Sequence, residues 1–255
     1  MIRVVVLGAM GRMGSEVVRA VFEDPDLELE AAVDPAGPAS SSEPFGIPVM
    51  KHISYLEGLD VDVVVDFTEA ASAVPNVLWA LDHGIHCVVG TTGISEDDLA
   101  SIGEKAEAGE ANVLLASNFA IGAILMMKFA EQAAAVFEEC EIIELHRRGK
   151  KDSPSGTAID TARLIASAMD ASEPPSSAEK LEESSRGASV GPVKIHSVRL
   201  DGLVAHQEVI FGAAGQTLSI RHDTTDRSCF MPGVVIAIKA VQGLNGLTVG
   251  LESVL

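Results

Sequence analysis

The sequence predicts an α/β fold, in which a doubly wound parallel sheet is followed by a second α+β domain with a mixed or antiparallel sheet. Three observations predict it. Short apolar runs alternate with helical segments over the first half of the chain, and a glycine-rich turn follows the first run. From about residue 121 this alternation gives way to strands joined by glycine-containing turns. Hydrophobic residues make up 47% of the chain and aromatic residues only 4%, which favours α/β over all-β architecture.

The first half is expected to begin with a βαβ unit. Residues 2–7 (IRVVVL) form an uninterrupted apolar run, as a strand buried on both faces does. A helix over 12–22 and a strand over 28–34 follow it. Residues 36–48 contain Gly, Pro and a Ser run, so they are predicted as a loop. The further elements expected here are strand 61–68, helix 70–83, strand 86–90, helix 95–108 and strand 112–116.

The second half is expected to hold a different layout. Residues 172–192 are rich in Ser, Glu, Gly and Pro and are predicted as a loop. We expect residues 1–118 with 231–255 to form one domain and residues 119–230 the other, with the last helix packing back on the first domain. The predicted elements are helix 121–139, strand 141–146, helix 157–170, strands 194–200, 205–211 and 216–222 with turns at Asp201-Gly202 and Ala214-Gly215, helix 233–242 and a final apolar segment, LTVGL.

Composition excludes several classes of partner. The chain carries 18 Lys and Arg against 37 Asp and Glu, a formal net charge of −19, so it should repel nucleic acid and anionic membranes. Three dispersed cysteines (Cys87, Cys140, Cys229) indicate buried free thiols and neither a disulfide framework nor a metal site. No apolar run approaches the roughly 18 residues of a membrane span, which favours a cytoplasmic protein. The acidity also suits a high-salt cytoplasm, a hypothesis that protection by molar potassium chloride would test.

The first turn has the features of a nucleotide-phosphate site. GAMGRMG (8–14) stands between a strand and a helix, with glycines at 8, 11 and 14. Small residues let the backbone approach a pyrophosphate, and the helix N-terminus offers free N–H groups. Gly14 would permit close packing of helix on strand. Asp34 ends the second strand, where a carboxylate can bind ribose hydroxyls and would repel a 2′-phosphate, so NADH should work at least as well as NADPH. Arg12 is the nearby base that could compensate.

A basic cluster stands out in this acidic chain. HRRGKK (146–151) leaves a predicted strand and runs into DSPSGTA, which opens a helix at Ser155, Gly156 and Thr157. Free N–H groups and hydroxyls at a helix start can bind a carboxylate. The pattern therefore predicts a pocket for a small anionic substrate, with His146 as a proton donor at neutral pH.

The same segment carries a family resemblance. ELHRRGKKDSPSGTA (144–158) resembles E-x-H-H-x-x-K-x-D-x-P-S-G-T-A, the signature of 4-hydroxy-tetrahydrodipicolinate reductases of diaminopimelate and lysine biosynthesis. The resemblance covers essentially the whole chain. It implies a Rossmann-like dinucleotide-binding domain, a substrate domain whose sheet builds a homotetramer, and reduction of a cyclic dicarboxylate by NADH or NADPH. The other matching segments are VLGAMGRMG (6–14), VDFT (65–68), GTTG (90–93), ASNFAIG (116–122), IHSVRLDGLVAHQEVIFG (195–212) and HDTTDRSCFMPGVVIAI (222–238).

The resemblance also implies roles for individual residues. His146 matches the general acid and Lys150 the lysine beside it, while Gly156 and Thr157 match residues that hold a substrate carboxylate, with Ser155 beside them. Arg147 stands where the family usually has a second His, and could grip a carboxylate but not donate a proton. The implied cofactor-binding residues are Gly8, Ala9, Met10, Gly11, Arg12, Met13, Asp34, Gly90, Thr91, Thr92, Ala116, Ser117, Asn118 and Phe119.

Weaker candidates and rival functions stay open. His222 and Arg227 could be structural or line a cleft, whereas His206 and Arg199 are expected to be structural. Met126 and Met127 are expected in a helix core. Gly149 and Ser117 also depart from the family pattern. The alternatives to the reductase are another small-substrate dehydrogenase, a non-catalytic NAD(P)-binding sensor and, against the overall charge, a polyanion-binding protein.

Overall fold

The computed structural model describes residues 1–37, 46–169 and 186–255. By its contacts the chain forms two compact units. Unit 1 comprises Met1–Ile121 and Arg227–Leu255, and unit 2 comprises Gly122–Asp226. Among the described residues, no helix is both long enough and apolar enough to cross a membrane.

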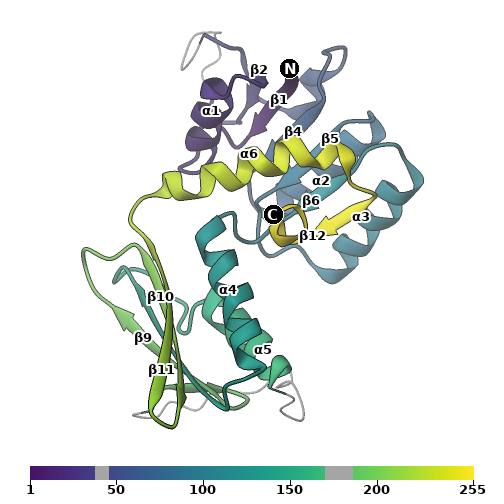
Figure 1. The fold of residues 1–255 in the computed structure, drawn as a ribbon. Coiled ribbons are helices and arrows are strands. Elements are labelled where there is room, and N and C mark those ends of the chain that lie inside the picture. Colours follow the sequence, from purple (N-terminus) through teal and green to yellow (C-terminus); the bar gives the residue numbers. More distant parts are fainter. Residues whose placement is uncertain (38–45, 170–185) are drawn as a thin grey trace. The chain divides into compact units, whose positions relative to one another are not determined.

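Unit 1 is built on a seven-stranded sheet in the order β12-β6-β5-β4-β1-β2-β3 (Figure 1). Every pairing in it is parallel, so all the strands end at the same edge. Val4–Leu7 of β1, all of β4 and Cys87–Val89 of β5 are buried, as their apolar runs predict. The bounds are β1 (Ile2–Leu7), β2 (Leu27–Val33), β3 (Val49–Met50), β4 (Val63–Asp66), β5 (His86–Val89), β6 (Val113–Leu115) and β12 (Leu247–Val249). The predicted strands of this sheet are confirmed, and β3 was missed because it is only two residues long.

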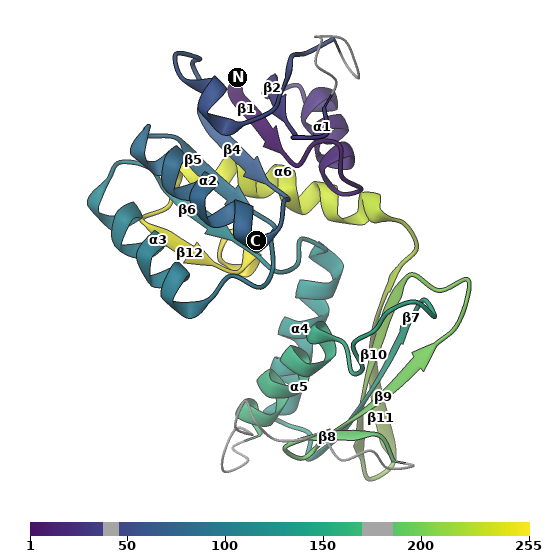
Figure 2. The ribbon, with the colours of Figure 1, turned by 180° about the vertical axis from the view of Figure 1, so that it is seen from behind.

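Helices cover both faces of this sheet (Figures 1 and 2). α1 contacts α6 on one face, and α2 contacts α3 on the other. α3 starts where Ser95 accepts the Asp98 N–H at 3.1 Å, a side-chain cap followed by three acidic residues that suit the positive end of the helix dipole. The helices are α1 (Gly14–Glu23), α2 (Ala70–Asp82), α3 (Glu96–Ala108) and α6 (Met231–Ala240), with short 3₁₀ turns at Ile53–Leu56, Arg227–Phe230, Val241–Gly243 and Leu251–Val254.

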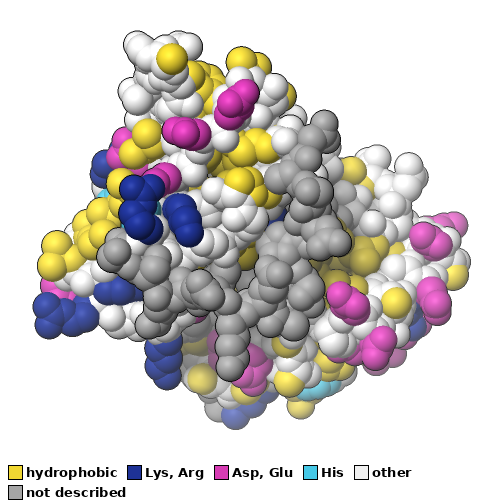
Figure 3. All heavy atoms as spheres, turned by 90° about the horizontal axis from the view of Figure 1, so that it is seen from below, with side chains coloured by type: hydrophobic (Ala, Val, Ile, Leu, Met, Phe, Trp, Pro, Cys, Tyr) yellow, Lys and Arg dark blue, Asp and Glu magenta, His cyan; other side chains and the backbone are white. Residues whose placement is uncertain are grey.

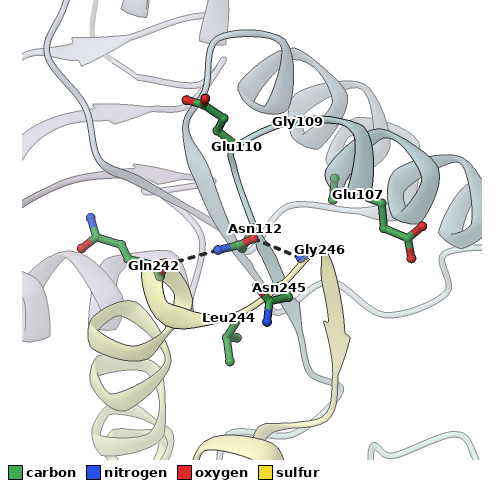
Figure 4. A pocket seen from close by; sticks show the side chains of 9 residues that line it. Glu107, Gly109, Glu110, Asn112, Gln242, Leu244, Asn245 and Gly246 are labelled. Carbon is green, nitrogen blue, oxygen red and sulfur yellow. Dashed lines mark hydrogen bonds between the residues drawn. The ribbon is translucent and has the colours of Figure 1, made fainter.

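The C-terminal segment completes unit 1, as predicted. α6 packs so closely that a Cβ on Gly233 would lie 2.1 Å from the Phe119 carbonyl oxygen. The buried Asn112 side chain then fastens the chain that leads into β12 (Figure 4). Its amide donates to the carbonyls of Val241 and Gln242 at 3.2 and 3.3 Å, and its oxygen accepts the Gly246 N–H at 3.0 Å. An open hollow of about 490 Å³ borders these residues, at the edge where β6 begins.

Unit 2 is a mixed five-stranded sheet in the order β11-β10-β7-β9-β8, with two helices on one face (Figure 1). Ala130 of α4, Ile165 of α5 and Phe211 of β10 are completely buried in the core between helices and sheet. Met126 is buried and Met127 packs against that core, which confirms both as helix-core residues. The bounds are α4 (Ile121–Ala134), β7 (Glu139–His146), α5 (Gly156–Ala168), β8 (Ala188–Val190), β9 (Val193–Arg199), β10 (Ala205–Ala213) and β11 (Gln216–Thr224).

Unit 2 corrects three sequence predictions. The turn at Asp201-Gly202 does not join neighbouring strands, because β7 lies between β9 and β10, parallel to the first and antiparallel to the second. Residues 188–190, predicted as loop, form edge strand β8. α4 ends at Ala134 and not near residue 139. The turn at Ala214-Gly215 is confirmed as a two-residue hairpin, with Gly215 at φ +78°. The parts of the predicted loops at 38–45 and 170–185 lie outside the described residues.

The prediction of buried free thiols is confirmed for two of the three cysteines. Cys87 and Cys140 are buried and free, and Cys229 is half-buried. Burial raises the pKa of the Cys140 thiol to about 12, so this sulfur is a packing group and not a thiolate.

Candidate active site

The glycine-rich turn joins β1 to α1 in unit 1, and its glycines are required by space. Gly8 has φ +75°, and a Cβ there would lie 2.9 Å from the Phe67 carbonyl oxygen. A Cβ on Gly14 would lie 2.0 Å from the Gly8 carbonyl oxygen, so only glycine lets α1 begin against the turn. This confirms the packing role predicted for Gly14. Met13 gives α1 no side-chain cap, which leaves the helix start suited to an external anion.

Asp34 follows β2 and binds the same turn. Its Oδ2 accepts the Met10 N–H at 2.9 Å and its Oδ1 accepts the Ala36 N–H at 2.8 Å. The residue is buried, at 9% exposure. The structure thus brings Asp34 and the predicted phosphate turn together, and it adds a role that the sequence did not indicate, because this carboxylate holds the backbone of the turn in place.

Asp66, at the end of β4, organises two more of the predicted segments. It is 1% exposed, and its Oδ1 accepts the Thr68 N–H at 2.9 Å and the Thr91 hydroxyl at 3.2 Å. The Thr68 hydroxyl also donates to Oδ1, at 2.6 Å, and the Asn76 amide donates to Oδ2 at 2.9 Å. A buried carboxylate with four donors fixes the loops after β4 and β5 against each other. Sequence reasoning missed this residue, although VDFT was among the segments it singled out.

Aromatic packing positions the remaining cofactor candidates. Gly90 follows β5 beneath the Phe67 ring, whose Cε1 would lie 2.2 Å from a Cβ at this position. The Phe67 and Phe119 rings pack 5.5 Å apart. Ala116 and Phe119 are buried after β6, whereas Thr92 and Ser117 are exposed. Asn118 turns the chain by accepting the Ala120 N–H at 2.9 Å. Every cofactor candidate therefore lies just beyond a strand end at one edge of the parallel sheet, where such sheets bind ligands.

In unit 2, His146 ends β7 and contacts a buried carboxylate. Its Nδ1 is paired with Oε2 of Glu144, whose side chain is 0% exposed. Burial opposes ionisation of Glu144, but hydrogen bonds from His146, Arg199 and Ser197 lower its pKa to about 2. The carboxylate is therefore ionised at neutral pH and accepts a hydrogen bond from the Nδ1 N–H. Nε2 is the imidazole nitrogen left for chemistry.

Arg199, at the end of β9, holds this carboxylate from the other side. Its Nη1 and Nη2 donate to the two Glu144 oxygens at 2.9 and 2.7 Å. Nη2 also donates to the Asp152 carbonyl at 2.7 Å, and the Asp152 carboxylate binds Lys150 Nζ at 2.7 Å. The Lys150 hydrogen bond holds the pKa of Asp152 below its ordinary value. The structure thus connects His146 and Lys150 through Glu144, Arg199 and Asp152. Arg199 was predicted to be structural; the network gives it a place at the site.

The start of α5 lies on the same loop. Ser155 is the N-cap, its hydroxyl accepting the Ala158 N–H at 3.3 Å, and it is buried. The Ile159 N–H is taken by the Ser155 carbonyl. Within the described part of the chain, the N–H groups of Gly156 and Thr157 have no partner, so they are available to an anion. Gly156 is exposed, with open space where a Cβ would stand.

The other candidates fall outside this network. Arg147 and Arg148 are exposed; the Arg147 carbonyl accepts the Lys150 N–H at 3.1 Å. His206 pairs with Asp223 at 2.7 Å across β10 and β11, as expected of a structural residue. His222 lies against Gly122, and burial lowers its pKa. Arg227 begins the segment that returns to unit 1.

Fold and site together define a class: a nicotinamide-dependent oxidoreductase with one nucleotide-binding unit of parallel-sheet type and a second unit that carries an imidazole near a helix start with available N–H groups. Residues 2–119 match the family described as dihydrodipicolinate reductase, N-terminus, and residues 122–255 match dihydrodipicolinate reductase, C-terminus. The chain belongs to the dihydrodipicolinate reductase family.

Individual relatives support the same family assignment. The chain is 48% identical over 255 residues to a 4-hydroxy-tetrahydrodipicolinate reductase of Streptococcus pneumoniae, covering 100% of this chain and 99% of that one. It is 45% identical over 261 residues to the enzyme of that name from Moorella thermoacetica, covering 100% and 98%. A dipicolinate-bound dihydrodipicolinate reductase from Paenisporosarcina sp. TG-14 superposes with a TM-score of 0.88 at 39% identity, over 100% of both chains.

Proposed function

We propose that the protein reduces 4-hydroxy-tetrahydrodipicolinate to tetrahydrodipicolinate, with a hydride from NADH or NADPH and release of water. Family membership sets the reaction class. The observation that carries the proposal is the network Glu144–His146, with Arg199 and Lys150, beside the open start of α5. An imidazole with one free nitrogen next to an anion-binding helix start suits a dicarboxylate that must receive a proton.

The residues of unit 2 would bind and protonate the substrate. The N–H groups of Gly156 and Thr157 would hold one carboxylate, with Arg147 and Lys150 supplying positive charge. The bound cofactor supplies the hydride. Negative charge then builds at the far end of the conjugated system, and His146 Nε2 would deliver the proton that neutralises it, contributing about 10²–10⁴-fold to the rate. Lys150 would stabilise that charge by its position.

The residues of unit 1 fit a dinucleotide. The turn over residues 8–13 has the small residues and helix start that a pyrophosphate needs, and residues 90–92 and 116–119 would hold the nicotinamide half. Asp34 stands where ribose hydroxyls are bound, and its charge disfavours a 2′-phosphate. We therefore expect NADH to work at least as well as NADPH. Steady-state kcat/KM with each cofactor measures this, and a strong preference for NADPH would contradict it.

Assembly and location complete the proposal. The outer face of β10 and β11 is exposed at Thr217, Ser219 and Arg221 and would form the contact of a homotetramer, as the family resemblance implies. Light scattering on the purified protein should give four times the chain mass, whereas a monomer would contradict this part. We expect the reaction to take place in the cytoplasm, where reduced nicotinamide cofactors are held.

Two rival functions make different predictions. A non-catalytic sensor would bind NAD(H) without turnover, and another dehydrogenase would act on a different small substrate. A polyanion-binding role gains little support, because the chain has a formal net charge of −19 and the face drawn in Figure 3 shows Lys and Arg side chains beside acidic and hydrophobic ones.

The deciding experiment follows loss of reduced nicotinamide absorbance while a dihydrodipicolinate synthase makes the substrate from pyruvate and aspartate semialdehyde. Robust wild-type turnover that falls about 10²–10⁴-fold in His146→Ala and Lys150→Ala would support the proposal. Cofactor binding without wild-type turnover would overturn it in favour of the sensor.

A further inference from the structure

Glu144 is a charged residue that is completely buried in unit 2, so its burial needs an explanation. Its side chain is 0% exposed and lies on the helix-covered face of β7, where an apolar residue would otherwise pack. A buried carboxylate is costly unless it is paired and hydrogen-bonded. Here the partners are His146, Ser197 and both terminal nitrogens of Arg199. Such a group holds its partners in fixed positions.

We propose that Glu144 and Arg199 are positioning residues that set the tautomer and the place of His146 for proton delivery. This inference rests on the proposed reductase function and deepens it. Neither residue needs to touch the substrate, since each acts through the imidazole.

The tautomer follows from what each group can donate. An ionised carboxylate only accepts hydrogen bonds, so Nδ1 of His146 must carry a proton. When Nε2 is also protonated, the imidazolium is stabilised by the adjacent negative charge of Glu144. Nε2 then gives its proton to the reduced substrate, and the imidazole remains with its Nδ1 proton until Nε2 is reprotonated from water. In each turnover one hydride and one proton are added and one water is released, so charge and atoms balance.

Arg199 keeps the carboxylate from rotating. Its two Nη atoms each donate a hydrogen bond to one Glu144 oxygen, which keeps Oε2 aligned with His146. The same Nη2 binds the Asp152 carbonyl, and Asp152 binds Lys150. Arg199 therefore fixes both proposed catalytic groups with respect to one buried anchor. In the described structure Glu144 contacts the imidazole directly, and Arg199, Asp152 and Lys150 are connected to it through Glu144.

Glu144→Gln tests the proposal, because it keeps the shape and removes the charge. Its amide nitrogen would face either an Arg199 N–H or the Nδ1 proton, so in either orientation one donor loses its acceptor and the imidazolium loses the adjacent negative charge. We expect kcat to fall about 10²-fold or more at neutral pH. The solvent deuterium isotope effect on kcat should rise as proton transfer becomes limiting.

The chain offers a matched control in Glu141→Gln. Glu141 lies on the same strand, three residues earlier and on the opposite face, and accepts a hydrogen bond from His196 at 2.7 Å. This variant should keep the wild-type kcat and solvent isotope effect. Equal effects of the two substitutions, or wild-type kcat and isotope effects in Glu144→Gln, would overturn the inference. Absence of turnover in the wild type would instead overturn the proposed function.

Arg199→Lys provides a second test if Glu144→Gln does not fold. A lysine keeps the charge but cannot place two donors on two oxygens, so kcat should fall while KM for the cofactor stays within about twofold. A raised solvent isotope effect would again be expected. Unchanged kcat and isotope effect in a folded Arg199→Lys protein would show that His146 needs no such anchor.

Discussion

The two units build their sites in opposite ways. In unit 1 the candidate cofactor residues are mainly backbone and small side chains, and the buried carboxylates Asp34 and Asp66 hold loops in shape. In unit 2 the candidate groups for proton delivery are charged side chains, and the buried carboxylate of Glu144 holds an imidazole and a guanidinium. A large ligand common to many enzymes is bound by shape, whereas a proton must be delivered by one group in one orientation. The difference predicts that the two sites fail in different ways.

The largest effect is expected from Gly14→Ala. The new Cβ would lie 2.0 Å from the Gly8 carbonyl, so α1 or the turn must shift. We expect a loss of about 1–3 kcal/mol or more in the free energy of unfolding, and no measurable NADH binding by fluorescence. Gly103→Ala in α3 is the control, because its Cβ would meet only the Leu247 side chain, at ordinary contact distances of 3.7 and 3.9 Å. Tight NADH binding by Gly14→Ala would show that the site of unit 1 does not depend on shape.

Asp66→Asn should have the next largest effect. The amide nitrogen brings a donor to a site where four donors already converge. We expect about 1–3 kcal/mol of lost stability in urea titrations and a KM for the cofactor raised about tenfold, with little change in KM for the substrate. Asp82→Asn, at an exposed surface pair with Lys105, should stay within about 0.5 kcal/mol. A change confined to the substrate KM would contradict the role given to Asp66.

Lowering the pH should test whether the ionised form of Glu144 stabilises unit 2. The pKa of Glu144 is lowered from 4.5 to about 2 in the folded protein, so its ionisation stabilises the fold above pH 4.5. That contribution is lost as the pH falls from 4.5 towards 2. Urea unfolding should therefore show a steeper loss of stability over this range in the wild type than in Glu144→Gln. Parallel curves for the two proteins would indicate that Glu144 is not held as an ion.

The smallest effect is expected from Arg147→His, which restores the usual residue of the family. Arg147 is exposed and outside the buried network. We expect a change of a few-fold in KM for the substrate and unchanged kcat and cofactor KM in steady-state assays. A drop in kcat as large as that of His146→Ala would place Arg147 in the chemistry itself.

Sequence patterns predicted the features that depend on residues close together in the chain. The glycine spacing at 8, 11 and 14 indicated both the turn and the tight packing, and apolar runs located the strands of unit 1. Strand order was not readable, because nothing in the periodicity of residues 139–146 says that β7 lies between β9 and β10. The roles of Asp66 and Glu144 were also missed. Their partners Thr91 and Arg199 lie 25 and 55 positions further along the chain, and only folding brings them together.

Because the C-terminal segment belongs to unit 1, unit 1 can be completed only after unit 2 has been synthesised. Residues 122–226 form one continuous stretch, so unit 2 can fold as soon as the ribosome has released it. Unit 1 must wait, since β6 has no neighbour on its outer edge until residues 247–249 arrive as β12 and α6 covers the sheet. The part of the protein that is made first is therefore finished last, and a nascent chain would hold an open strand edge that ribosome-associated chaperones are suited to shield.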